Sequence, residues 1–214
     1  MSDRKRYQPL VSRHALVLAG FALFVTTILA VTNHSTSNRI AKNEKQQREK
    51  IFLEILPAYN YDYPPNQFKL EIVDDNTQMT RHCYIAAVNG TPVATVITAT
   101  ATDGYAGEIE LLVGIMADGT VSGVRVSKHN ETPGLGDAIE LHRSHWIKAF
   151  DGKSLAAPEE SGWALRKDNG VYDQFTGATI TPRAVVKEVK NTLLFFRQHK
   201  VQILQDVNEN KIQK

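Results

Sequence analysis

The sequence predicts an α+β fold, with a mostly antiparallel sheet flanked by helices and one N-terminal transmembrane helix. Three observations support this prediction. An uncharged apolar run covers residues 15–31, two pairs of strand-like segments are joined by Gly-containing turns, and a late segment repeats apolar residues at helical spacing. The length of 214 residues and the 42% hydrophobic content suit one packed domain with an appendage.

The composition excludes several classes of protein. Lys and Arg number 25 against 23 Asp and Glu, so the formal charge of +2 gives no basic footprint for nucleic acid. Cys83 is the one cysteine, which rules out an intrachain disulfide framework and any four-cysteine metal or iron–sulfur site.

Residues 15–31 form the predicted membrane anchor. Their length lies at the short end of the roughly 17–25 residues that cross a bilayer as a helix. A cleaved signal peptide is the alternative, but its apolar region is typically about 7–15 residues, and residues 30–32 make a poor cleavage site. Four basic residues precede the run and favour a cytoplasmic location for residues 1–14, although basic residues also follow it. Both readings export the rest of the chain, which in a Gram-negative cell means to the periplasm.

A stalk and an irregular connector are expected over residues 32–82. Asn38–Leu56 is rich in Lys, Glu, Gln and Arg, which predicts a largely solvated helix that ends at Pro57. The segment from Ala58 to Thr80 contains Pro64-Pro65 and three tyrosines, and we expect it to be irregular.

The main domain is expected over residues 83–199. Residues 84–88 and 92–100 flank Asn-Gly, and residues 109–116 and 121–127 flank Asp-Gly, so both pairs predict β-hairpins. A helix is expected to begin after Gly136 and to run toward His145.

The last element of this domain is the clearest helix. Thr181 is a candidate N-cap and Pro182 suits the first helical position. The apolar positions that follow at helical spacing are Val185, Val189, Leu193 and Phe196. Residues 200–214 are expected to form a C-terminal tail.

Common catalytic and cofactor motifs are absent from the sequence. Gly134-Leu-Gly136 continues as Asp-Ala-Ile and not as a dinucleotide-binding loop, and there is no phosphate-binding P-loop. His142 and His145 lack nearby partners for a metal site, so none is expected. Cys83 is expected to be a small buried apolar residue.

The segment 173–182, DQFTGATITP, is the strongest chemical signal in the chain. Gly177 and Ala178 allow a ligand to approach the backbone closely, and Thr179 presents a hydroxyl just before a helix. The first amide groups of that helix would favour a phosphate. A plain glycine turn with threonine caps is an equally good interpretation on residue chemistry alone.

This segment resembles the flavinylation motif of the covalent FMN-binding domain family. Glu131-Thr-Pro-Gly-Leu-Gly136 resembles a second family motif, and Asp103-Gly-Tyr-Ala-Gly107, leading into residues 111–114, resembles a third. With the single N-terminal span, the chain resembles the G subunits of Rnf/Rsx ion-translocating electron transport complexes. The C subunit of the sodium-translocating NADH:quinone reductase is the nearest alternative, but its longer insert after the anchor does not match the short stalk here.

The resemblance implies that FMN is esterified through its phosphate to Thr179 by a separate flavin transferase. It implies a redox subunit with no catalytic residues of its own, which relays electrons among membrane and iron–sulfur subunits at the inner membrane. We expect further cofactor contacts from Asp173, Thr176, Gly177, Ala178, Thr181, Glu131, Thr132, Gly134, Leu135 and Gly136. A periplasmic scaffold without redox function is the alternative of another class.

Overall fold

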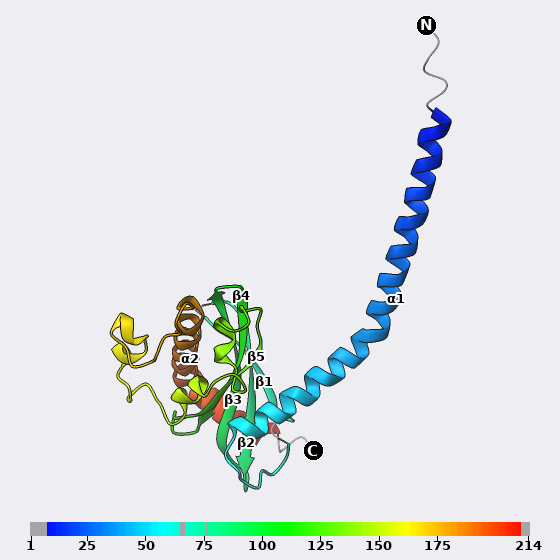
Figure 1. Cartoon of the computed structure of the whole chain (residues 1–214). Helices are drawn as coiled ribbons and strands as arrows, with labels where there is room; N and C mark the ends of the chain where they lie inside the picture. The colour runs from blue at the N-terminus through cyan, green and yellow to red at the C-terminus, as the bar shows by residue number, and fades with distance from the viewer. Residues whose placement is uncertain (1–7, 65–66, 76, 211–214) are drawn as a thin grey trace. The chain divides into compact units, whose positions relative to one another are not determined.

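A five-stranded antiparallel sheet organises the larger of the two compact units of the chain. The computed structural model describes residues 8–64, 67–75 and 77–210, with side chains for 13–33, 35–37, 50–64, 67–75 and 77–205. The chain divides into residues 1–47 and 48–214, and each unit is considered by itself. The sheet belongs to the second unit and confirms the predicted α+β class (Figure 1).

The first unit contains most of the long helix α1 (Gln8–Ile55). Within it, Arg13–Ser37 contains an 18-residue window with a mean hydropathy of 2.4 and is long and apolar enough to cross a membrane. This candidate span contains the predicted apolar run of residues 15–31. It indicates a membrane-anchored protein by length and composition, criteria that a signal sequence near the N-terminus also meets.

The strands follow one another in the sheet in chain order. They are β1 (Lys69–Val73), β2 (Thr80–Val88), β3 (Thr91–Gly104), β4 (Gly107–Met116) and β5 (Val121–Lys128). Both predicted hairpins are confirmed. At the β2–β3 turn Asn89 and Gly90 have φ angles of 50° and 78°, which is the conformation that favours an Asn-Gly pair.

The prediction of an irregular segment from Ala58 to Thr80 is wrong in one part. Strand β1 lies within it and pairs antiparallel with β2, Leu70 standing opposite Cys83. Its side chains alternate in burial, since Leu70 and Ile72 pack against the core while the other three are exposed, so the segment does carry the strand pattern that the prediction missed.

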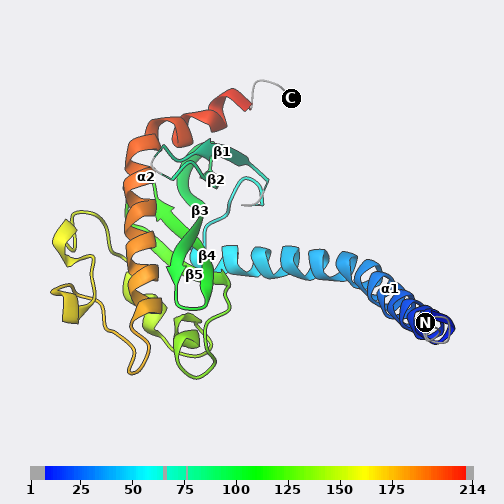
Figure 2. The same cartoon turned by 90° about the horizontal axis from the view of Figure 1, so that it is seen from above.

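The sheet is covered on both faces. Side chains alternate between the faces along each strand, so that Cys83, Ile85 and Ala87 of β2 join one core cluster while Tyr84 and Ala86 join another. Helix α2 (Ile180–Asn210) packs in the first cluster through all four apolar residues predicted for it, which confirms that helix (Figure 2). The predicted tail continues this helix, and Ile203 is fully buried.

The end of α1 covers the second face and corrects the picture of a solvated stalk. Ile51, Phe52 and Ile55 are buried in the second cluster, whereas Ile40 lies outside the described side chains. A Cβ atom on Gly114 would lie 2.1 Å from Ile55 Cγ2, so this glycine of β4 makes room for the helix end. Ile51, Phe52, Ile55 and Leu56 therefore belong to the core of the second unit.

A buried ion cluster ties the edge of the sheet to α2. Arg81 on β2 contacts Asp74 at 2.8 Å through Nε and Glu188 on α2 at 2.9 Å through Nη1. Burial raises the pKa of Glu188, while the nearby Arg81 guanidinium opposes this shift. The three charged side chains thus hold β1, β2 and α2 in one arrangement.

The predicted helix from Gly136 toward His145 does not form. A single 3-10 turn, η1 (Gly136–Ile139), stands there, and a second, η2 (Trp146–Phe150), follows. Two side chains bond to the backbone in place of a regular helix. The Asp137 carboxylate accepts from the Gly134 amide at 2.8 Å, and the Ser144 hydroxyl donates to the Ala138 carbonyl at 2.7 Å.

Candidate functional site

The segment 175–179 forms a tight turn directly before α2. The Ala178 amide donates to the Phe175 carbonyl at 3.3 Å, and Gly177 has a φ of 82°, which a glycine adopts without strain. Thr179 is the last residue before the helix begins at Ile180. Its half-buried side chain therefore stands at the positive end of the helix dipole.

The prediction that Thr181 caps the helix is wrong. Thr181 lies inside the first turn, and its fully buried hydroxyl donates to Glu131 Oε2 at 2.5 Å. Pro182 is the third helical residue, where a missing N–H still costs the helix nothing. The hydroxyl is thus directed at a distant loop and not at the helix backbone.

Glu131 joins three segments that are far apart in the sequence. Besides the Thr181 hydroxyl, this buried carboxylate accepts the Ala106 amide of the β3–β4 turn at 3.0 Å through Oε1. A Cβ on Gly104 or Gly136 would approach a Glu131 oxygen to 2.9 Å, so both glycines leave room for it. Both Glu131 oxygens are therefore occupied by the protein, and the residue braces the site.

The loop after β5 supplies one wall of the site. The Thr132 carbonyl accepts the amides of Leu135 and Gly136 at 3.1 and 3.0 Å, which folds the loop into a compact turn. Gly134 takes a φ of 79° within it. This geometry leaves the Leu135 side chain exposed at the surface.

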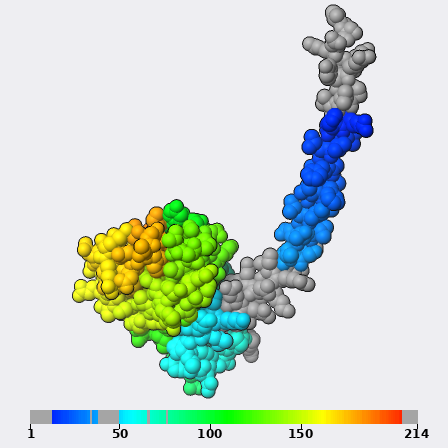
Figure 3. All heavy atoms as spheres, viewed as in Figure 1, coloured from blue at the N-terminus to red at the C-terminus, as the bar shows by residue number. Residues whose placement is uncertain are grey.

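These segments enclose a cleft of about 380 Å³. It is lined by Tyr105, Glu131, Thr132, Leu135, Gly136, Gly177, Ala178, Thr179, Ile180 and Thr181. The β3–β4 turn and the first turn of α2 lie at the same end of the sheet (Figure 1), and residues of both line the cleft. In the space-filling view, orange atoms of the α2 start lie against green atoms of the sheet region there (Figure 3). Its volume is in the range of about 300–1,000 Å³ that small-molecule sites occupy.

Three of the predicted contacts lie outside this lining. Asp173 is exposed and pairs with Arg166 at 3.1 Å, and its carbonyl accepts the Trp146 indole N–H at 2.7 Å. Thr176 is exposed, and neither Thr176 nor Gly134 is among the residues that line the cleft. The remaining predicted residues do line it, since the fold brings the second and third motif segments to the Thr179 turn.

Two lining residues, Tyr105 and Ile180, had no predicted role. Tyr105 lies within the motif 103–107, and the family resemblance of that motif assigns its side chain no function. Ile180 is the apolar residue between two threonines of the main motif. Because the β3–β4 turn is far from Thr179 in the sequence, only the folded sheet reveals this proximity.

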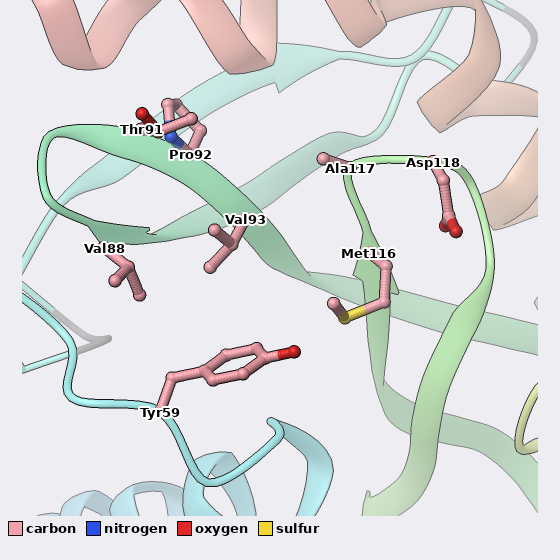
Figure 4. Close-up of a pocket in the computed structure, with 8 residues that line it drawn as sticks. All are labelled: Tyr59, Val88, Thr91, Pro92, Val93, Met116, Ala117 and Asp118. Carbon is pink, nitrogen blue, oxygen red and sulfur yellow. The ribbon is translucent and has the colours of Figure 1, made fainter.

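A larger hollow elsewhere carries none of the motif residues. It measures about 450 Å³ and is lined mainly by apolar side chains, among them Tyr59, Val93 and Met116 (Figure 4). It contains one carboxylate, Asp118, and no hydroxyl beyond Thr91 and the Tyr59 phenol. The chemistry of the chain therefore favours the smaller cleft as the functional site.

Cys83 is a core residue, as predicted. Its side chain is fully buried on β2, and burial raises the pKa of its thiol to about 12. A thiol with such a pKa stays protonated and unreactive at neutral pH.

Comparison with known proteins matches both parts of the chain. An FMN-binding domain family matches residues 104–194, and an RnfG N-terminal region family matches residues 6–55. Relatives named as the G subunit of an ion-translocating oxidoreductase complex match almost end to end. The Pseudomonas aeruginosa PAO1 protein is 43% identical over 195 residues, covering 90% of this chain and 91% of the relative. The Escherichia coli K12 protein is 43% identical over 196 residues, covering 91% and 95%. The chain therefore belongs to the family of G subunits of ion-translocating oxidoreductase complexes.

Proposed function

We propose that the chain is a membrane-anchored flavoprotein subunit that relays electrons through FMN bonded by a phosphoester to Thr179. The observation that carries this proposal is the position of Thr179. It lines the cleft directly before a long helix, between two further motif segments, whereas the Thr181 hydroxyl is bonded to Glu131. The FMN-binding family match over residues 104–194 includes two of the segments whole and the third from residue 104 on, and it supports FMN as the ligand.

The residues of the cleft fit a tethered flavin phosphate. The first amides of α2 provide donors without intrahelical partners, which suits an anion. No Lys or Arg is among the lining residues that the structure describes, so the charge of the phosphate would rest on the helix dipole, at about 0.3–1 kcal/mol. Such weak retention favours a covalent bond as the means of holding the cofactor.

The remaining residues of the site shape the cleft around the tether. Gly177, Ala178 and Gly136 leave space beside Thr179, while Glu131 fixes the loop wall and the first turn of α2. In the attachment step a flavin transferase would join the Thr179 oxygen to the flavin phosphorus of FAD. AMP leaves as the pyrophosphate bond breaks, and the hydroxyl proton passes to the transferase site. Bound FMN supplies the redox chemistry, and the protein supplies its position.

The partners and location follow from family membership as proposals. The relatives are named as subunits of a complex, so we expect other membrane and iron–sulfur subunits to contact this chain. We place the protein in the bacterial inner membrane through Arg13–Ser37, with the domain that carries Thr179 in the periplasm. The redox-inactive scaffold stays as the alternative, and an absorbance spectrum of the purified protein distinguishes it because a scaffold is colourless.

The test of the proposal compares Thr179→Val with Thr176→Val. Both changes remove a hydroxyl and nearly preserve shape, but Thr176 lies outside the cleft lining. After coexpression with the transferase, we expect Thr179→Val to lose all fluorescence in a denaturing gel and the corresponding mass. Thr176→Val should keep at least part of both. Denaturation removes flavin that is merely bound, so the remaining signal reports a bond.

A fluorescent Thr179→Val protein would refute the assignment of the acceptor. A labelled peptide that maps to Thr176 or Thr181 would do the same. Circular dichroism of both variants serves as the folding control, because a misfolded variant would lose flavin for an unrelated reason.

A further inference from the structure

Three large apolar side chains surround the mouth of the Thr179 cleft with much of their surface in solvent. Tyr105 is 68% exposed, Ile180 46% and Leu135 45%. They come from the β3–β4 turn, the first residue of α2 and the loop after β5. Single exposed apolar residues are ordinary on a protein surface, but three that line one cleft form a patch typical of a binding site.

The turn that carries Tyr105 is fixed to the rest of the site. The Ala106 amide donates to Glu131 Oε1 at 3.0 Å, and Asp103 pairs with Lys187 of α2 at 2.7 Å. Gly104 stands opposite Gly107 across the turn, and a Cβ on Gly104 would lie 2.3 Å from the Gly107 carbonyl oxygen. The Tyr105 ring is therefore presented at the cleft mouth by a turn that is held on both sides.

We propose that Tyr105 packs against the isoalloxazine ring of the flavin, and that Leu135 and Ile180 complete an apolar seat for that ring. The inference rests on the proposed attachment at Thr179 and adds the group that positions the ring. A phosphoester at Thr179 leaves the ring free to rotate, so the tether alone does not fix the distance over which electrons pass.

The chemistry of the mouth suits a flat aromatic ligand. The only carboxylate among the lining residues is Glu131, and both of its oxygens already accept protein donors. Three of the lining residues have small side chains or none and leave space in the cleft: Gly136, Gly177 and Ala178. The aromatic ring of Tyr105 offers a flat face for offset stacking. An apolar ring would thus cover side-chain surface that is otherwise exposed to water.

Tyr105→Ala tests the seat, and Tyr59→Ala is its matched control. Tyr59 is an exposed tyrosine of the same unit that lies in the other hollow (Figure 4). Each full-length variant is coexpressed with the transferase and purified in detergent. The emission intensity and anisotropy of the flavin are then measured before and after denaturation. A phenol in contact with a flavin quenches its fluorescence, so native wild-type protein should be dim and should brighten several-fold when denatured.

We expect native Tyr105→Ala to be several-fold brighter than wild type and to have lower anisotropy, because the ring loses its contact. Tyr105→Phe should keep the anisotropy but lose the quenching, since a benzene ring packs as well and is a poor electron donor. Tyr59→Ala should behave as wild type. Because Tyr105 is mostly exposed, its substitution should leave the fold intact, which circular dichroism checks.

The outcomes separate this inference from the one on which it rests. If every variant carries covalent flavin, and wild type and Tyr105→Ala have equal native emission and anisotropy, the proposed contact between Tyr105 and the ring is wrong. The attachment at Thr179 would be unaffected. Equal changes in Tyr59→Ala and Tyr105→Ala would also overturn the contact. Wild-type protein without flavin after denaturation would overturn the attachment, and with it the seat.

Discussion

At the scale of single residues, the geometry of the site depends on a carboxylate whose two oxygens each accept a hydrogen bond from another segment of the protein. Glu131 accepts the Ala106 amide and the Thr181 hydroxyl, and it is 4% exposed. Removal of Glu131 would take the acceptor from a donor on each of two other segments. A buried donor without an acceptor destabilises the folded state by roughly 1–3 kcal/mol. Glu131 was predicted as a cofactor contact, and the structure adds this bracing role.

Glu131→Ala should therefore lower the free energy of unfolding by about 1–3 kcal/mol, chiefly because the buried Thr181 hydroxyl loses its acceptor. Glu131→Gln should cost much less. Its amide oxygen can accept from Ala106, and the Thr181 hydroxyl can turn to accept from the amide nitrogen. Urea unfolding of residues 48–214 measures both changes.

Glu108, an exposed residue of β4, provides the control for that experiment. Glu108→Ala should change the unfolding free energy by no more than about 0.5 kcal/mol. If Glu131→Ala unfolds at the same urea concentration as Glu108→Ala, the carboxylate does not brace the site.

At the scale of elements, the last turns of α1 act as part of the sheet domain. Ile55 lies over Gly114 and Gly123 on adjacent strands, where the missing side chains bring the helix close to the sheet. Phe52 packs edge-to-face on Tyr84 of β2 with ring centroids 5.0 Å apart. The domain consequently begins within the helix, ahead of the proline that marks its end.

Adjacent residues of α1 allow a direct test of this packing. Phe52 is fully buried, while Leu53 is 72% exposed. In a chain of residues 48–214, Phe52→Ala should lower the unfolding free energy by about 3–5 kcal/mol because it leaves a cavity. Leu53→Ala should change it by less than about 0.5 kcal/mol. Similar urea midpoints for the two variants would mean that the helix end is not part of the core.

At the scale of the whole molecule, the sequence predicted the elements that have strong local signals. The hairpins carry Asn-Gly and Asp-Gly turns, and α2 repeats its apolar residues over many turns, so both were predictable. The strand β1 was missed, although Leu70 and Ile72 alternate with exposed residues, because the pairs Pro64-Pro65 and Asp74-Asp75 around it indicated an irregular segment. The expected helix after Gly136 failed because Asp137 and Ser144 bond to the backbone there.

For the candidate site, too, the sequence predicted the part with a strong local signal and missed the contacts between distant segments. The segment around Thr179 has a distinctive local sequence, so its position before a helix could be predicted. The role of Glu131 and the presence of Tyr105 in the cleft depend on contacts between segments far apart in the chain, which no local pattern encodes.

The last prediction concerns the side of the membrane on which the Thr179 domain lies. Arg4, Lys5, Arg6 and Arg13 precede the apolar run of residues 15–31, and positive charge close to a span favours its cytoplasmic end. A reporter that is active only in the periplasm should therefore be active when fused after Lys214. A reporter active only in the cytoplasm should be inactive at the same site.

Replacement of the four preceding basic residues by Ser or Asn provides the matched variant for this test. Because basic residues also follow the span, at Arg39, Lys42 and Lys45, their charge should then favour the opposite orientation. We expect the fraction of chains with an active periplasmic reporter to fall, and flavin attachment to fall with it if the transferase acts only in the periplasm. A cytoplasmic reporter that is active on the wild-type chain would overturn the predicted topology, because a single span places the two ends of the chain on opposite sides.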